Sequence, residues 1–109
     1  MAITINIRYT GTCGSARAFA EEMVASGIVD AIRTEDGNLR YEYFVPLDDP
    51  ETVLLVDTWR DQAALDAHHA SSMMAHIAEL RDKYDLHMQV ERFVSDDSVP
   101  DGDRRFIRE

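Results

Sequence analysis

The chain has 109 residues, 45% of them hydrophobic, and a formal net charge of -10 at pH 7. This length and composition suit one compact domain with a modest core. The acidic excess argues against nucleic acids or an anionic membrane as partners, because both need a basic footprint. No apolar run approaches the roughly 20 residues of a membrane span and no signal peptide is visible, so we expect a cytoplasmic protein. The single cysteine, Cys13, excludes an intrachain disulfide, and the sequence contains no recognisable set of metal ligands.

The first half of the chain predicts a strand, a helix and a second strand. Ile3, Ile5 and Ile7 alternate with polar residues, as in a half-buried strand. Apolar residues recur at helical spacing over residues 19–32, which predicts one helix, with Ser15 as its N-cap. Asp36-Gly37-Asn38 ends this helix, and the alternation over residues 39–45 predicts the next strand.

The second half predicts a strand, a helical region and a last strand. Residues 52–59 are β-branched and apolar on both faces, which is typical of a strand buried on both sides. Asp61 is the expected cap of a helix that follows, and Ser71-Ser72 allow a break before a second helical stretch to about Tyr84. Alternation over residues 86–90 predicts the final strand.

The resulting order is β-α-β-β-α-β, which predicts an α+β, ferredoxin-like fold with a four-stranded antiparallel sheet and both helices on one face. We expect residues 1–94 to form this domain. Residues 95–109 form an acidic C-terminal tail that is either mobile or docked on a partner subunit.

Assembly follows from the same topology. Two helices cover one face of a four-stranded sheet, yet residues 53–56 offer apolar side chains to both faces. An uncovered apolar face of several hundred Å² is rare in monomers. We therefore expect a homodimer in which the sheet faces stack about a two-fold axis.

Trp59 and His68 are the first candidates for a functional site. The strand that ends on Trp59 is followed by a helix that brings His68 to its sheet-facing side. An imidazole has an ordinary pKa near 6.5 and can act as a base, while an indole can stack on a flat ligand and donate its N–H. The alternative for both residues is structural: a helix histidine bonded to a backbone carbonyl and an aromatic plug at the sheet edge.

Further candidates surround this pair. Asn6 and Arg8 project opposite to the isoleucines, where they either line a cavity or pair with charges. Tyr41 is expected in a pocket or in the dimer interface, and Asp57 in a surface or cross-strand pair. The remaining candidates for an apolar wall are Leu65, Met73 and Met74.

These motifs resemble the antibiotic biosynthesis monooxygenase family of dimeric α+β barrels. The resemblance spans about residues 3–93, and its most specific part is the run 53–59 followed by 64–68, supported by 37–42. Small bacterial members include a quinol monooxygenase and an autoinducer-2 phosphate isomerase, so the family does not by itself determine the reaction.

The chain departs from the family at two places. Ser71-Ser72-Met73 replaces a Thr-Pro-His step, so a second imidazole is missing from its usual spot. Members that degrade haem carry a ligand histidine at a position that corresponds by spacing to Ala78. The asparagine that such enzymes use on the first strand would correspond to Asn6, but alignment on Arg8 displaces it by one residue, which reverses the face.

The resemblance implies a monooxygenase that needs no cofactor and no metal and acts on a small aromatic phenol or hydroquinone. In that hypothesis His68 is the base, Asn6 and Trp59 stabilise an oxyanion, and a set of further residues binds the substrate: Leu65, Met73, Met74, Tyr41 and Arg8. Two alternatives stay open. One is an isomerase or tautomerase of a small carbonyl compound, favoured if Arg8, Arg40 and Arg92 converge on the pocket. The other is a dimeric small-molecule binder without catalysis.

Overall fold

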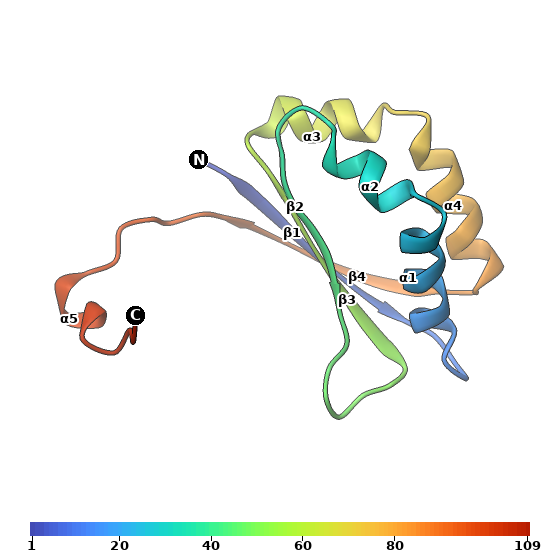
Figure 1. Ribbon diagram of the computed structural model, residues 1–109, viewed down its shortest axis with the longest axis horizontal. Helices are drawn as coiled ribbons and strands as arrows, with labels where there is room; N and C mark the ends of the chain where they lie inside the picture. Colours follow the sequence, from blue (N-terminus) through green and yellow to red (C-terminus); the bar gives the residue numbers. More distant parts are fainter.

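The computed structural model describes residues 1–109 and confirms the predicted ferredoxin-like order. Helices cover one face of a single sheet, and the other face is open (Figure 1). The elements are β1 (Ile3–Thr10), α1 (Ser15–Ala25), α2 (Ile28–Arg33), β2 (Asn38–Phe44), β3 (Thr52–Trp59), α3 (Gln62–His69), α4 (Met73–Lys83), β4 (His87–Val94) and α5 (Asp101–Arg104).

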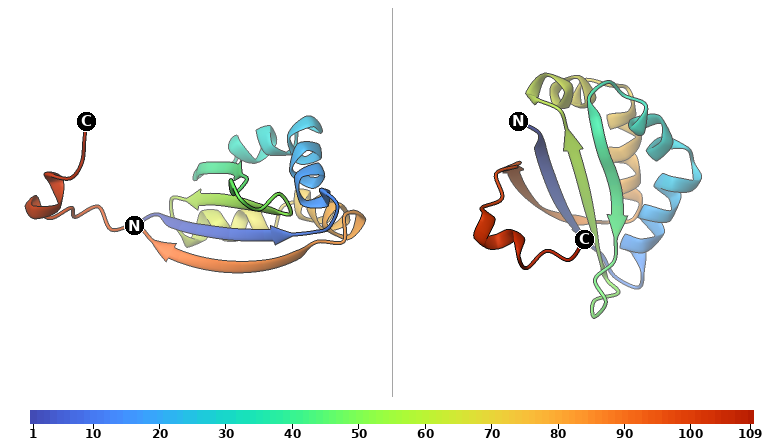
Figure 2. Two further views of the ribbon diagram at one scale, coloured as in Figure 1. Left: turned by 90° about the horizontal axis from the view of Figure 1, so that it is seen from below. Right: turned by 60° about the vertical axis from the view of Figure 1, so that its left-hand side comes forward.

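The four strands are antiparallel and lie in the order β2-β3-β1-β4, side by side in the left view of Figure 2. Ile3 pairs with Trp59 and Tyr9 with Val53, so the odd-numbered residues of β1 and β3 share one face. These residues pack beneath the helices: Val53, Leu55 and Trp59 are buried. The even-numbered residues of the same strands point to the open face.

Two of the predicted helix boundaries differ from the structure. The helix expected over residues 19–32 is two helices, because Gly27 adopts φ 86 and ends α1 before α2 begins. This left-handed conformation is one that glycine adopts without a steric penalty. Ser15 is the first residue of α1 instead of its cap, and its hydroxyl accepts a bond from the Thr12 N–H at 3.0 Å.

The helical region after β3 follows the prediction closely. The Asp61 carboxylate accepts a hydrogen bond from the backbone N–H of Ala64 at 2.9 Å and so caps α3. The chain then breaks at Ser71 and Ser72 before α4 begins. None of the five helices has the length and apolar composition that a membrane crossing requires.

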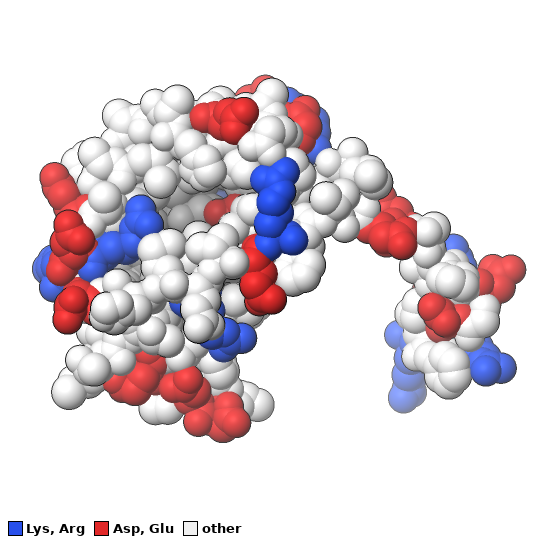
Figure 3. Space-filling model, turned by 180° about the vertical axis from the view of Figure 1, so that it is seen from behind, with Lys and Arg blue, Asp and Glu red and all other residues white.

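Strand β4 is the edge strand that the helices do not cover. Every residue of β4 is exposed, including Met88, Val90 and Val94 on the side that faces the helices. Seen from behind, the molecule is hollowed, and acidic atoms show at the bottom of the hollow (Figure 3). Beyond β4 the chain runs away from the domain to the short helix α5, none of whose residues is buried (Figure 1).

Candidate functional site

Trp59 and His68 lie in direct contact, as the sequence predicts. Their rings stack with centroids 4.6 Å apart and planes inclined by 27°. Trp59 is fully buried and His68 is 4% exposed. The short connection through the Asp61 cap starts α3 directly after β3, so that the helix folds back over the strand and brings the imidazole onto the indole.

Glu35 is the partner of His68 and was not among the site residues predicted from the sequence. The Nδ1 of His68 lies 2.9 Å from the Glu35 carboxylate. Burial lowers the pKa of His68 below its ordinary value, against the effect of Glu35, which raises it. The ring is therefore neutral at pH 7. Because a carboxylate only accepts hydrogen bonds, Nδ1 carries the proton and Nε2 keeps its lone pair.

Asp57 is a second buried acid–base group at the same place. The prediction of a surface or cross-strand pair for this residue was wrong: Asp57 is 5% exposed and faces the helices. One of its carboxylate oxygens, Oδ1, accepts the indole N–H of Trp59 at 2.7 Å. Burial raises the pKa of the Asp57 carboxyl to about 6, and the bond from Trp59 acts in the opposite direction.

These groups border a cavity of about 40 Å³ between the sheet and the helices. A water molecule takes up roughly 30 Å³ in the liquid, so the cavity has room for about one water or a diatomic molecule. Burial raises the pKa of Tyr9 to about 12 and also raises that of Tyr41, so both phenols stay protonated and can donate. The lining consists of Ile7, Tyr9, Tyr41, Leu55, Asp57, His68, His69, Met74, Ile77 and Arg81.

Two half-buried, flexible side chains, Met74 and Arg81, belong to the lining of the cavity. The guanidinium of Arg81 on α4 lies 3.1 Å from the sulfur of Met88 on β4. Met74 lies on the same helix, one turn before Ile77. Because β4 is uncovered, this side is where a larger molecule could enter once Arg81 and Met74 move aside.

The structure brings together only part of the predicted site. His68, Tyr41 and Met74 line the cavity, with Trp59 directly behind the imidazole. Leu65 is 2% exposed and belongs to the packed core. Met73 lines a different hollow, whose other members are Glu35, Asp36, Arg60, Ala63, Ala64, Ala67 and Ser71.

Asn6 and Arg8 are not brought to this site. Asn6 pairs with Val56 and Arg8 with Leu54, so both side chains point to the open face of the sheet, opposite to His68. The one-residue displacement noted in the sequence accounts for this, because Ile7 occupies the position that faces the cavity.

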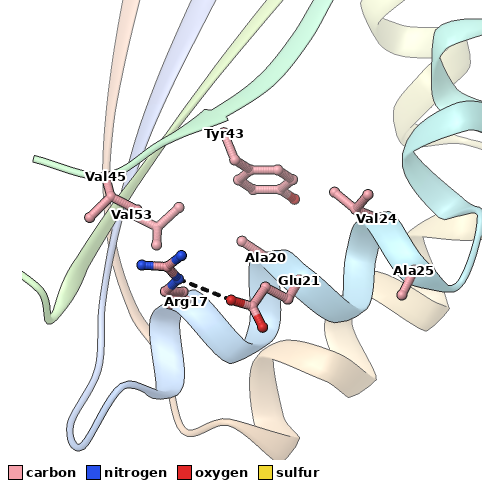
Figure 4. A pocket seen from close by; sticks show the side chains of 8 residues that line it. All are labelled: Arg17, Ala20, Glu21, Val24, Ala25, Tyr43, Val45 and Val53. Atoms are coloured by element: carbon pink, nitrogen blue, oxygen red, sulfur yellow. Dashed lines mark hydrogen bonds and ion pairs between the residues drawn. The ribbon is translucent and has the colours of Figure 1, made fainter.

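A larger cleft of about 490 Å³ lies between α1 and the β2–β3 edge. Figure 4 shows its lining side chains converging from α1, β2 and β3, with Tyr43 across from Val24. Its two charged members, Arg17 and Glu21, form an exposed ion pair at 2.9 Å. Catalysis needs groups that exchange protons near pH 7, and the small cavity holds two of them, so we place the candidate site there.

The side chains that would favour haem degradation, or the isomerase alternative, are not assembled around the cavity. Ala78 is exposed on α4 and offers no haem ligand. Arg40 lies on the open face with Arg8, and Arg92 donates to Gln62 at 2.6 Å. No group of three or more His, Cys, Asp and Glu side chains is close enough to hold a metal ion.

Comparisons with known proteins agree with the fold. A protein of Deinococcus radiodurans that bears the family name of antibiotic biosynthesis monooxygenases has a TM-score of 0.76 at 19% identity, over 92% of this chain and 97% of its own. SnoaB, a cofactor-independent oxygenase of Streptomyces nogalater, has a TM-score of 0.73 at 16% identity, over 92% and 98%. PA3566 of Pseudomonas aeruginosa has a TM-score of 0.73 at 23% identity, over 86% and 93%.

At these identities the structural likeness establishes the shared fold. No curated protein matches the sequence. The model of the antibiotic biosynthesis monooxygenase family matches residues 2–80, which is more than half of the chain. The chain therefore belongs to the antibiotic biosynthesis monooxygenase family.

Proposed function

We propose that this protein is a cofactor-independent monooxygenase of a small, electron-rich phenol or hydroquinone. The observation that carries the proposal is the buried imidazole of His68 at the wall of the cavity, with its Nδ1 2.9 Å from the partly buried carboxylate of Glu35. A base oriented by a carboxylate is the arrangement that activates a hydroxyl group in many enzymes.

His68 is the proposed base. Its Nδ1–H is held by Glu35, which leaves the Nε2 lone pair for the hydroxyl proton of the substrate. Because burial lowers the pKa of His68, the imidazole stays neutral and able to accept a proton throughout the physiological range. Ionising the substrate is the essential step, since an electron-rich phenolate can itself pass an electron to oxygen.

The hydroxyls of Tyr9 and Tyr41 are the proposed donors to the charge that develops on oxygen. The Trp59 indole N–H, the donor expected from the sequence, is already held by Asp57. The cavity itself is too small for an aromatic ring, so the ring would enter from the side of Met74 and Arg81 and leave the cavity for oxygen.

The reaction balances without a further reductant. The substrate loses a hydroxyl proton and a proton from the carbon that oxygen attacks, and it supplies four electrons. One oxygen atom remains as a new carbonyl on that carbon, and the other leaves as water. A substrate of the anthrone type would give the corresponding quinone in this way.

Oxygen uptake tests the proposal. With a menadiol-type or anthrone-type substrate, we expect uptake above autoxidation for the wild type and a loss of about 100-fold to 10,000-fold in His68→Gln. His76→Gln is the matched control, because His76 is exposed on α4 and does not line the cavity. Uptake that never exceeds the protein-free rate, over a range of such substrates, would refute the proposal.

The same experiment without oxygen separates the two enzymatic hypotheses. An oxygenase forms no product under anaerobic conditions, whereas an isomerase or tautomerase continues to turn over. If ligand binding were found without any turnover, and if His68→Gln left that binding unchanged, the non-catalytic alternative would be favoured.

A further inference from the structure

The proposed oxidation removes two protons from the substrate, and a single imidazole accounts for only one of them. We propose that Asp57 is a second catalytic residue, which takes the proton from the ring carbon that oxygen has attacked. This inference rests on the proposed function and adds a step that follows oxygen addition.

The geometry of the cavity supports the assignment of the two protons to two different bases, His68 and Asp57. Asp57 and His68 both line the cavity, and Trp59 contacts both of them from outside the lining. The indole stacks on the imidazole at 4.6 Å and donates its N–H to Asp57 Oδ1 at 2.7 Å. Because Oδ1 is occupied, the second oxygen, Oδ2, is the one left to act on a molecule in the cavity.

Asp57 has the protonation state that a base requires. Its pKa of about 6 leaves most of the carboxyl ionised at pH 7, yet it is a much stronger base than an exposed aspartate. Its immediate cross-strand neighbours are Ile5 on β1 and Tyr41 on β2. The other titratable and charged groups that line the cavity are Tyr9, Tyr41, His68, His69 and Arg81, and the Tyr43 phenol lies close enough for the charge of Asp57 to raise its pKa.

The steps balance as follows. His68 removes the hydroxyl proton, and the resulting anion combines with oxygen to form a carbon–oxygen bond and a peroxide. The imidazolium returns its proton to the outer peroxide oxygen, which gives a hydroperoxide. Asp57 then takes the proton from the same carbon, whose bonding pair forms the carbonyl while the O–O bond breaks. The departing hydroxide recovers the proton from Asp57 and leaves as water.

This assignment predicts a specific defect in Asp57→Asn. Asparagine has nearly the same shape and can still accept the Trp59 N–H, but it cannot take a proton. In a rapid-quench single turnover, we expect oxygen addition at nearly the wild-type rate and hydroperoxide breakdown slowed by about 100-fold or more. The hydroperoxide is quantified by iodometry and by mass spectrometry after phosphine reduction. Asp66→Asn is the matched control, because Asp66 is exposed on α3 and bonded to Gln62.

Two further variants keep the test decisive if Asp57→Asn does not fold. Asp57→Glu retains a carboxylate and should restore breakdown of the hydroperoxide. Trp59→Phe removes the N–H that stabilises the ionised carboxyl, so the pH midpoint of the breakdown step should move upward. Deuterium on the reacting carbon should slow this step in the wild type.

Each other outcome has a definite meaning. If folded Asp57→Asn forms product without accumulating hydroperoxide, Asp57 is not the second base. If it loses oxygen addition altogether, Asp57 acts earlier and the assignment is also overturned. If the wild type itself takes up no oxygen, the proposed function fails, and this result is distinct from a failure confined to Asp57.

Discussion

The two faces of the sheet carry polar residues under opposite conditions. On the helix-covered face, Asp57 is almost completely buried and its carboxylate holds the Trp59 N–H. On the open face, Thr4 and Thr58 bond each other at 2.9 Å, and Arg8 is exposed. Neighbours along one strand therefore lie in different environments, and burial on the covered face raises the pKa of Asp57 to about 6.

Replacing Trp59 should have the largest effect on stability. Trp59→Ala removes a fully buried ring, leaves a cavity beneath α3 and deprives the Asp57 carboxylate of the indole N–H that donates to it. We expect a loss of about 3–5 kcal/mol in the free energy of unfolding, measured by urea denaturation. The adjacent Thr58→Ala removes only one open-face hydrogen bond and should cost about 1 kcal/mol. Similar losses in the two variants would contradict the distinction between the faces.

Asp57→Asn should stabilise the protein at neutral pH. The pKa of Asp57 is raised in the folded state from 3.8 to about 6, so ionising this group costs stability as the pH rises through that window. Asparagine removes the cost, with a gain of up to about 3 kcal/mol above pH 6 and little gain below pH 4. Unfolding midpoints measured from pH 4 to pH 8 test this. A difference between variant and wild type that does not change with pH would show that Asp57 is not desolvated.

His68 contributes to the same pH profile with the opposite sign. Its pKa is lowered in the folded state, so the unfolded chain takes up the proton first and the native state loses stability as the pH falls below about 6.5. This acid-side loss should persist in Asp57→Asn and disappear in His68→Gln.

The open face allows a test of the predicted dimer. Val56 is half-buried there and pairs with Glu42 across the strand, so a lysine is tolerable in an isolated subunit but costly between two stacked sheets. We expect Val56→Lys to sediment as a monomer at concentrations at which the wild type is dimeric. Val90 is also exposed but lies on the helix-facing side of β4, so Val90→Lys should leave the assembly unchanged. A monomeric wild type at micromolar concentration would exclude this interface.

The smallest effects should come from Arg8 and Asn6. Both point away from the cavity, so Arg8→Ala and Asn6→Ala should leave the oxygen-uptake rate of the wild type within about twofold if the sheet face acts only in assembly. A loss comparable to that of His68→Gln would mean that these residues reach a site after all, through a partner subunit.

The order of elements could be read from the sequence because it depends on local signals. Alternation marked β1 and β2, and the Asp61 cap and Ser71-Ser72 marked the limits of α3. The break at Gly27 was missed because the apolar stripe continues through it, although Ser26-Gly27 could have indicated it. The candidate site could be predicted only where periodicity sets direction, as for His68 and Trp59.

The sequence by itself determined which residues share a face, because the two-residue period of a strand and the 3.6-residue period of a helix are local properties. Only the tertiary structure decided that Glu35, from a connection between elements, meets His68, and that Asp57 is buried instead of solvated. Both depend on how the helices α1 to α4 pack over one face of the sheet, because the pKa of a group depends on how far this packing removes it from water.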